Sequence, residues 1–177
     1  LSVGLNYWKH LEEMAGTPTP KYPAAFIKSR DSLSGSGSPI FVPPQCPDML
    51  DYEGEFCFVF GEQCHNVSAD KAMEYIVGYT IMNDLSARDL GKREDWPRFG
   101  VDSFGHKKID TSAPLGPWIT PADQLTDPYK CRMKLWVNDE EMQNELISDL
   151  IFDIAEQIEW VSRRFTLLPG DVFSTGT

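Results

Sequence analysis

The sequence predicts a mixed α/β fold that is rich in β-strands. Short extended runs are separated by turn-forming residues, because 13 glycines and 13 prolines are scattered along the chain. Segments with helical spacing are few, and they do not alternate regularly with the strands as they do in a doubly wound sheet. The pattern therefore favours sheets that carry a few short peripheral helices.

The expected strands follow the extended runs in chain order. The runs are residues 1–5, 52–60, 77–83, a short piece at Ile119, 133–137 and 172–175. Asn138 and Asp139, followed by Glu140, predict a hairpin turn after the run 133–137, although the glycine that would strengthen this prediction is missing.

Three segments carry the signals of helices. Asn6 and Ser68 are expected to cap short helices that end near residues 13 and 76. The clearest helix is expected to begin after Asp153, with Glu156 as its capping-box partner. One face of this helix is apolar at the spacing of helical turns, in Ile154, Ile158, Val161 and Phe165.

Composition is that of an ordinary globular protein and excludes some classes of function. The chain has 177 residues, of which 41% are hydrophobic and 24% charged, which suits one domain better than two. The net charge of -11 and the lack of a basic run argue against a nucleic-acid partner. An anionic substrate would need local positive charge, from a metal ion or from a few lysines and arginines.

The cysteines and the hydropathy pattern indicate an intracellular protein. The four cysteines lack the spacing of a zinc site, and we expect them to be small buried residues in a reducing compartment: Cys46, Cys57, Cys64 and Cys131. No segment is apolar for long enough to span a membrane, and no leader is visible. A cytoplasmic or mitochondrial location is expected, with no membrane partner.

The run 51–60 is the most informative segment. Side chains of a strand alternate between its faces, so Asp51, Glu53 and Glu55 share one face while Tyr52 and three phenylalanines share the other. Acids two residues apart lie roughly 6.5 Å apart, which lets both bind one cation. Without a cation, such closely spaced like charges cost stability. The alternative interpretation is a solvated edge strand that carries acids to prevent aggregation.

A further acid is expected at the end of the next strand. Asp84 directly follows the run 77–83, where a side chain can face a cavity. Carboxylate oxygens suit hard ions such as Mg²⁺, Mn²⁺ or Ca²⁺, and no set of Cys and His argues for zinc. Asp89 is an alternative third ligand, and spacing alone does not decide between Asp84 and Asp89.

These motifs together resemble the fumarylacetoacetate hydrolase superfamily. The resemblance rests on Asp51-Tyr-Glu53-Gly-Glu55, on Gly78-Tyr-Thr80 and on Asn83-Asp-Leu-Ser-Ala-Arg-Asp89. Further matches occur in the family's order, at residues 4–7, 26–28, 113–117, 137–138, 168–171 and 175–177. Nearly the whole chain is covered, so residues 1–177 are expected to form a single catalytic domain that is truncated at both ends.

The resemblance implies a β-sandwich roll of mixed sheets, usually in a homodimer. It implies Glu53, Glu55 and Asp84 as metal ligands, which favours Asp84 over Asp89. It also implies catalytic roles for His10, Glu13 and Lys107, and substrate contacts for Lys28, Arg88 and Thr177. Lys108 is adjacent to Lys107, so a misalignment of one residue would exchange the two lysines.

One departure from the family concerns the substrate. Many relatives have Gln three residues after the arginine of the Arg88 motif, whereas this chain has Gly91. Losing that amide removes a hydrogen-bond partner and opens space, so the most familiar substrate of the family is not assumed.

The implied function is a divalent-metal-dependent hydrolase that cleaves a carbon–carbon bond in a small acylpyruvate-type 2,4-dioxo acid through a metal-bound enolate. In this hypothesis His10, oriented by Glu13, activates water, and Lys107 stabilises the enolate. Decarboxylation of an oxaloacetate-type β-oxo acid is the runner-up, followed by isomerisation, tautomerisation or hydration on the same scaffold. A metal-stabilised binding protein without catalysis is the alternative from another class.

Overall fold

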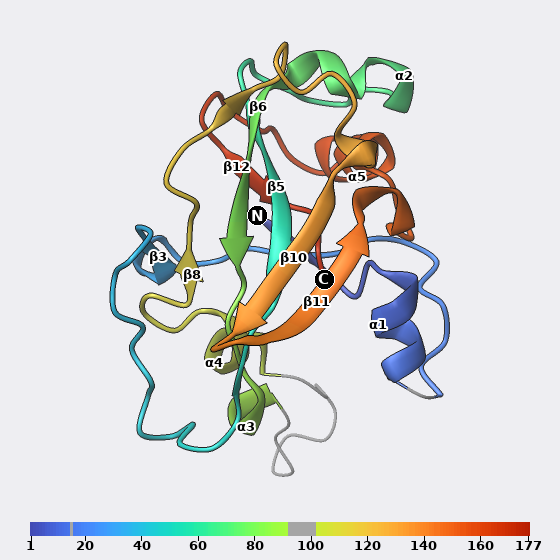
Figure 1. Ribbon diagram of the computed structural model, residues 1–177. Helices are drawn as coiled ribbons and strands as arrows, with labels where there is room; N and C mark the ends of the chain where they lie inside the picture. Colours follow the sequence, from blue (N-terminus) through green and yellow to red (C-terminus); the bar gives the residue numbers. More distant parts are fainter. Residues whose placement is uncertain (15, 92–101) are drawn as a thin grey trace. The chain divides into compact units, whose positions relative to one another are not determined.

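The computed structural model describes residues 1–14, 16–91 and 102–177. The chain divides into two compact units, and each is described by itself. The first unit contains residues 1–27, 54–81 and 118–177, and the second contains residues 28–53 and 82–117. The expected mixed, strand-rich fold with a few short helices is confirmed (Figure 1).

A six-stranded sheet with the order β2-β1-β12-β5-β6-β9 organises the first unit. Its strands are β1 (Ser2–Gly4), β2 (Ala24–Phe26), β5 (Gly54–Phe60), β6 (Ile76–Asn83), β9 (Thr120–Pro121) and β12 (Val172–Ser174). β1 runs parallel to β12, while β12 runs antiparallel to β5 with Phe173 opposite Phe58. The C-terminal strand β12 therefore lies between the N-terminal strand β1 and β5, the strand that leads out of the acidic motif.

The core of this unit forms around β5, in which every residue from Gly54 to Phe60 is buried. The rings of Phe58 and Phe173 stack with their centroids 4.8 Å apart. β5 lies between β12 and β6 and is buried along its whole length, so the alternative interpretation of a solvated edge strand is wrong.

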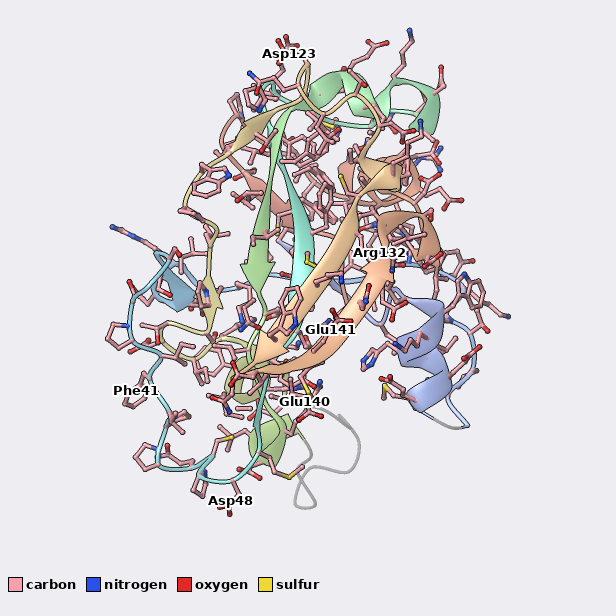
Figure 2. All side chains as sticks on the ribbon, viewed as in Figure 1. Phe41, Asp48, Asp123, Arg132, Glu140 and Glu141 are labelled. Atoms are coloured by element: carbon pink, nitrogen blue, oxygen red, sulfur yellow. The ribbon has the colours of Figure 1, made fainter. Side chains whose placement is uncertain are left out.

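A long hairpin crosses in front of the sheet in the view of Figure 1. It consists of β10 (Arg132–Val137) and β11 (Glu140–Leu146), and the turn between them has Asn138 at a φ of 54°. The predicted hairpin turn is therefore confirmed without a glycine. Figure 2 shows Arg132 at the start of β10 and the acidic pair Glu140 and Glu141 at the opposite end of the hairpin.

The helices of this unit are short, as expected. They are α1 (Trp8–Glu13), α2 (Ala69–Ala72), which continues as a 3-10 turn over Met73–Tyr75, and α5 (Ile154–Ser162); further 3-10 turns cover Pro128–Lys130 and Ile147–Asp149. The capping box of Asp153 and Glu156 at the start of α5 is confirmed. Phe165, expected on the same helical face, lies beyond the end of α5.

The predicted cap at Asn6 is wrong, because Tyr7 occupies the N-cap position of α1. The Asn6 amide is buried and instead donates to the carbonyls of Phe152 and Thr175, while its oxygen accepts from the amide of Phe152. A buried amide must find partners, and here the partners come from segments more than 140 residues away.

The second unit is built from very short elements. They are the 3-10 turn Arg30–Ser32, β3 (Leu33–Ser34), β4 (Leu50–Asp51), β7 (Ser86–Ala87), α3 (Arg88–Gly91), α4 (Ser103–Lys107) and β8 (Ala113–Pro114). β3 pairs in parallel with β8, and β4 pairs antiparallel with β7, which places Asp51 opposite Ser86. The segment that carries Phe41 and Asp48 (Figure 2) is tied down by bonds from the Phe41 amide to Thr111 and from the Asp48 amide to Asp89.

Candidate metal centre

Two hydrogen bonds donated by backbone amides hold Glu53 beside Asp84. The amide of Glu53 donates to the side-chain oxygen of Asn83 at 2.9 Å, and the amide of Asp84 donates to the carbonyl of Glu53 at 2.7 Å. Asp84 follows β6 directly, as the sequence predicted, and it is fully buried. The end of β6 therefore fixes two acidic side chains next to each other.

Glu55 is the third acid. It lies two residues after Glu53 and is the second residue of β5. One of its oxygens accepts hydrogen bonds from the Ser174 hydroxyl and from the Gly176 amide, the latter at 3.1 Å. Glu53, Glu55 and Asp84 are 6%, 1% and 0% exposed, and acids are buried to this degree only when charged or hydrogen-bonding partners accompany them.

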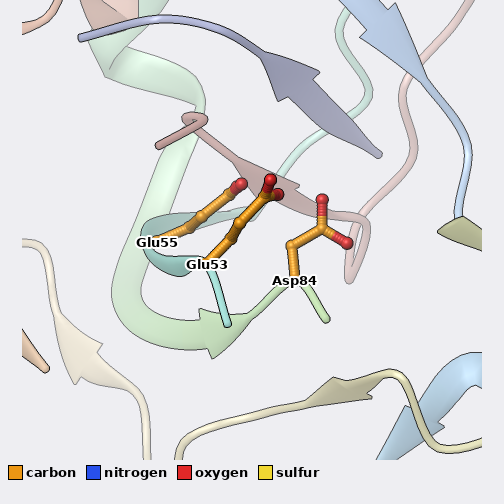
Figure 3. A group of neighbouring side chains, drawn as sticks. All are labelled: Glu53, Glu55 and Asp84. Atoms are coloured by element: carbon orange, nitrogen blue, oxygen red, sulfur yellow. The ribbon is translucent and has the colours of Figure 1, made fainter. Parts of the chain in front are cut away.

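The three carboxylates form a group that fits a divalent cation. Each of Glu53, Glu55 and Asp84 offers an oxygen, and these oxygens lie within 4.8 Å of one another (Figure 3). Hard ions such as Mg²⁺, Mn²⁺ and Ca²⁺ prefer oxygen ligands of this kind, whereas zinc sites use Cys and His more often. The donor set therefore agrees with the expected metal, and its chemistry does not select one hard ion.

Two lysines balance the charge of these acids inside the second unit. The ammonium of Lys28 donates to Asp84 at 2.7 Å and to the hydroxyl and carbonyl of Ser112 at 2.9 and 3.2 Å. The ammonium of Lys107 donates to Glu53, to Asp84 at 3.0 Å and to the Ser86 hydroxyl at 2.5 Å. Both lysines are buried. Positive charge therefore lies within hydrogen-bonding distance of the proposed ligands.

Arg88 adds a third cation to this network. Its Nε donates to Asp51 at 2.9 Å, and its Nη2 donates to Glu53 at 2.6 Å. Burial lowers the pKa of Arg88, but the negative charges of Glu53 and Asp51 outweigh burial and raise it overall. The guanidinium is thus held in one orientation by two carboxylates.

His106 also belongs to this network, and sequence reasoning did not single it out. Its Nε2 lies 3.3 Å from an Arg88 nitrogen, and α4 places it next to Lys107. Burial lowers the pKa of His106 to about 4, assisted by the positive charges of Lys107 and Arg88. The imidazole is therefore neutral at pH 7. A lone histidine in this part of the sequence carries no spacing signal that would have identified it.

The sequence left two choices open: Asp84 or Asp89 as a metal ligand, and Lys107 or Lys108 as the lysine of the site. Asp89 lies away from the carboxylate group and accepts hydrogen bonds from the amides of Asp48 and Met49 at 3.3 and 3.1 Å. The ammonium of Lys108 lies 6.0 Å above the ring of Phe104, while Lys107 contacts the acids. The geometry agrees with Asp84 as ligand and with Lys107 as the site lysine.

The remaining candidates belong to the first unit. On α1, His10 Nδ1 lies 3.4 Å from a Glu13 oxygen, and the two side chains are 26% and 62% exposed. The Thr177 hydroxyl accepts from the Gln143 amide at 2.7 Å and donates to the Gly54 carbonyl at 3.4 Å. His10 and Glu13 therefore form the expected contact, and their catalytic roles stay a prediction.

Comparison with known proteins decides the family. The description "Fumarylacetoacetate (FAA) hydrolase C-terminal" matches residues 1–177. The chain belongs to this family. Its members include two curated proteins named oxaloacetate tautomerase, fahd2 from Xenopus laevis and YisK from Bacillus subtilis, which are 36% and 35% identical over all of this chain. This chain spans 54% and 57% of their lengths.

A solved structure of the family contains a metal ion. Fumarylpyruvate hydrolase from Pseudomonas aeruginosa, in complex with Mn²⁺ and pyruvate, is 33% identical with a TM-score of 0.87, over 99% of this chain and 76% of that chain. The family resemblance and the fold class are thereby confirmed, and the family's members are enzymes. In the part of this chain that the structure describes, no helix has the length and apolar character needed to cross a membrane.

Proposed function

We propose that this protein is a divalent-metal-dependent hydrolase that cleaves a carbon–carbon bond in a small acylpyruvate-type 2,4-dioxo acid. The observation that carries the proposal is the contact of the Lys107 ammonium with Glu53 and Asp84. A buried ammonium beside a cation site stabilises negative charge that develops on a substrate oxygen, because the surroundings exclude water.

Each side chain has a role in this proposal. Glu53, Glu55 and Asp84 would hold a divalent cation, Mg²⁺ or Mn²⁺, which supplies Lewis-acid polarisation of a 2-oxo acid when it is bound. Lys107 offers its N–H groups to the enolate oxygen of the leaving fragment. Lys28 and Arg88 would bind the substrate carboxylate.

His10 and Glu13 would supply the proton chemistry. In this scheme His10 accepts a proton from water, and Glu13, 3.4 Å from the imidazole, orients the ring. Water adds to the carbonyl at C4, the bond between C3 and C4 breaks, and its electron pair forms the enolate of pyruvate. Protonation of that enolate at carbon completes the reaction, so one dioxo acid and one water give pyruvate and a carboxylic acid.

A second candidate, oxaloacetate tautomerase, is favoured by the names of the Xenopus and Bacillus relatives. The same residues suit it, because moving a proton between carbon and oxygen passes through an enolate as well. The two reactions differ in the use of water, since tautomerisation breaks no carbon–carbon bond and releases no pyruvate.

The products of a short substrate panel distinguish these functions. The protein is assayed with acetylpyruvate, a longer acylpyruvate and oxaloacetate, with Mn²⁺ or Mg²⁺ and with EDTA. Metal-dependent pyruvate and a stoichiometric carboxylic acid from an acylpyruvate support hydrolysis. Pyruvate and CO₂ from oxaloacetate indicate decarboxylation, and a change between enol and keto absorbance without pyruvate indicates tautomerisation. Full activity after chelation contradicts the proposal.

The variant His10→Gln tests the role of water activation. Hydrolysis is expected to fall by roughly 10²–10⁴-fold, the usual contribution of a general base. A matched control is Lys9→Gln on the same helix, because Lys9 pairs with Glu145 at 2.6 Å and has no role in the proposal. A homodimer remains the expected assembly, and light scattering of the protein in solution measures it.

A further inference from the structure

The His106 ring on α4 packs against Gly91 of α3, and the absence of a side chain on Gly91 leaves room for it. A Cβ atom on Gly91 in α3 would lie 3.2 Å from Nδ1 of His106, closer than ordinary van der Waals contact. A Cβ atom on Gly105 in α4 would approach Asp102 at 3.1 Å and Leu90 at 3.5 Å. A larger residue at Gly91 would therefore press on the His106 ring, and one at Gly105 would press on Asp102 and Leu90.

The backbone fixes α4 in this position. The amide of Asp102 donates to the carbonyl of Gly91 at 3.1 Å, and the Asp102 side chain caps α4 by accepting from the amides of Phe104 and Gly105. The amide of His106 then donates to the Asp102 carbonyl at 2.9 Å. The imidazole is therefore attached to a capped turn whose start is bonded to the end of α3.

The contact between His106 and Arg88 determines the state of the imidazole. A guanidinium only donates hydrogen bonds, because it has no free acceptor. The His106 Nε2 atom at 3.3 Å must therefore accept from Arg88, which requires a neutral ring with its proton on Nδ1. Burial and the neighbouring positive charges favour the same neutral state.

We propose that His106 is a positioning residue that holds the Arg88 guanidinium in the orientation in which it receives the carboxylate of the substrate. Arg88 donates hydrogen bonds to Asp51 and Glu53, and its Nη1 lies next to Nε2 of His106. This role rests on the proposed function in one respect only, which is that the ligand received by Arg88 is the carboxylate of the substrate. The tautomer of the ring and the fit against Gly91 are independent of any activity.

The first test measures the tautomer directly. In ¹⁵N NMR spectra of the metal-free protein at pH 7, His106 is expected to show a protonated Nδ1 and an unprotonated Nε2. The assignment comes from the spectrum of His106→Gln, in which the signals of His10 and His65 remain. A ring protonated on Nε2, or on both nitrogens, would overturn the proposal even if the enzyme is active.

A second test uses paired variants. Gln places an acceptor oxygen close to the position of Nε2, whereas Leu fills similar space without an acceptor. With the best substrate of the panel, His106→Leu should raise KM roughly tenfold, the scale of one hydrogen bond to a charged group. The same variant should leave kcat within about twofold, because binding and not chemistry is affected. His106→Gln should restore KM, and equal KM values for the two variants contradict the positioning role.

If no substrate of the panel is turned over, the affinity of the Mn²⁺-loaded protein for pyruvate replaces KM in the comparison of His106→Leu with His106→Gln.

The packing of His106 against Gly91 is tested by thermal melts of Gly91→Ala, His106→Ala and the double variant. Gly91→Ala should lower Tm in the wild-type background and not in the His106→Ala background. Equal Tm changes in both backgrounds would show that the ring does not pack against Gly91.

Discussion

The buried pair of Lys28 and Asp84 predicts a large and metal-dependent loss of stability in the variant Lys28→Met. The two charged groups are 2.7 Å apart, and their side chains are only 3% and 0% exposed. Methionine keeps most of the side-chain volume but leaves the Asp84 carboxylate buried without this ammonium. Breaking a buried pair by removing one partner costs about 3–5 kcal/mol, and because Lys107 still contacts Asp84 we expect a loss near the lower end of this range in the free energy of unfolding.

The assay is urea unfolding in EDTA, with Lys71→Met as a matched control. Lys71 pairs with Glu74 at 3.3 Å, but both side chains are more than half exposed, at 61% and 67%. An exposed pair contributes about 0–1 kcal/mol, so the control should unfold almost like the wild type.

Adding Mn²⁺ completes the test of Lys28. A cation bound by Asp84 compensates its charge and stabilises the folded state, by about 2.7 kcal/mol at a hundredfold excess over Kd. The deficit of Lys28→Met should therefore shrink when Mn²⁺ is present, whereas the control should not change relative to wild type. The reasoning is refuted if Lys28→Met loses less than about 1 kcal/mol in EDTA, because breaking a buried pair would cost more.

Three further predictions concern His106, Asp153 and Phe58. The folded-state pKa of His106, about 4, lies below its ordinary 6.5, so the unfolded state binds more protons between these values. Metal-free protein should lose stability from this group as pH falls from 6.5 to 4, and none above 6.5, but less than the full shift in pKa would give, because the ring is partly exposed and solvent screens it. Urea unfolding of wild type and His106→Leu across this range measures the difference, which vanishes if the ring titrates normally. Asp153→Ala should cost about 1 kcal/mol in chemical unfolding, because it removes the cap of α5, and no change would mean that this cap is not formed in solution. Phe58→Ala should cost about 3–5 kcal/mol, since its ring is fully buried against Phe173, and a cost below 1 kcal/mol would contradict the stacked core.

Local signals in the sequence were sufficient for several elements of the fold. The box of Asp153 and Glu156 depends only on residues three apart, and the hairpin turn at Asn138 depends on two strands that are adjacent in the chain. Asn6 shows the limit of such reasoning, because its amide is used by segments that only the folded chain brings close. At Asn6, an asparagine just before a helix is compatible with a helix cap and with a buried tertiary contact, and the sequence alone does not distinguish the two.

The residues of the candidate site also divide into those that local sequence patterns predicted and those whose contacts depend on tertiary packing. The acids at Glu53 and Glu55 were visible from their spacing, and the position of Asp84 at a strand end was visible from the pattern of the next strand. The choice of Asp84 over Asp89 came from family resemblance, because both acids follow the same strand. The meeting of His106 with Arg88 depends on how α3 and α4 pack, and single-sequence reasoning has no access to that packing.

Titration with Mn²⁺ tests whether Glu53, Glu55 and Asp84 together hold one divalent cation. Free Mn²⁺ is counted by its EPR signal during titration of the wild-type protein, Asp84→Asn and Asp89→Asn. We expect one Mn²⁺ per chain in the wild type and in Asp89→Asn, and a loss of at least roughly tenfold in affinity, or about 1.4 kcal/mol, in Asp84→Asn. Absence of binding in the wild type, or equal affinity in Asp84→Asn, would contradict this cation site.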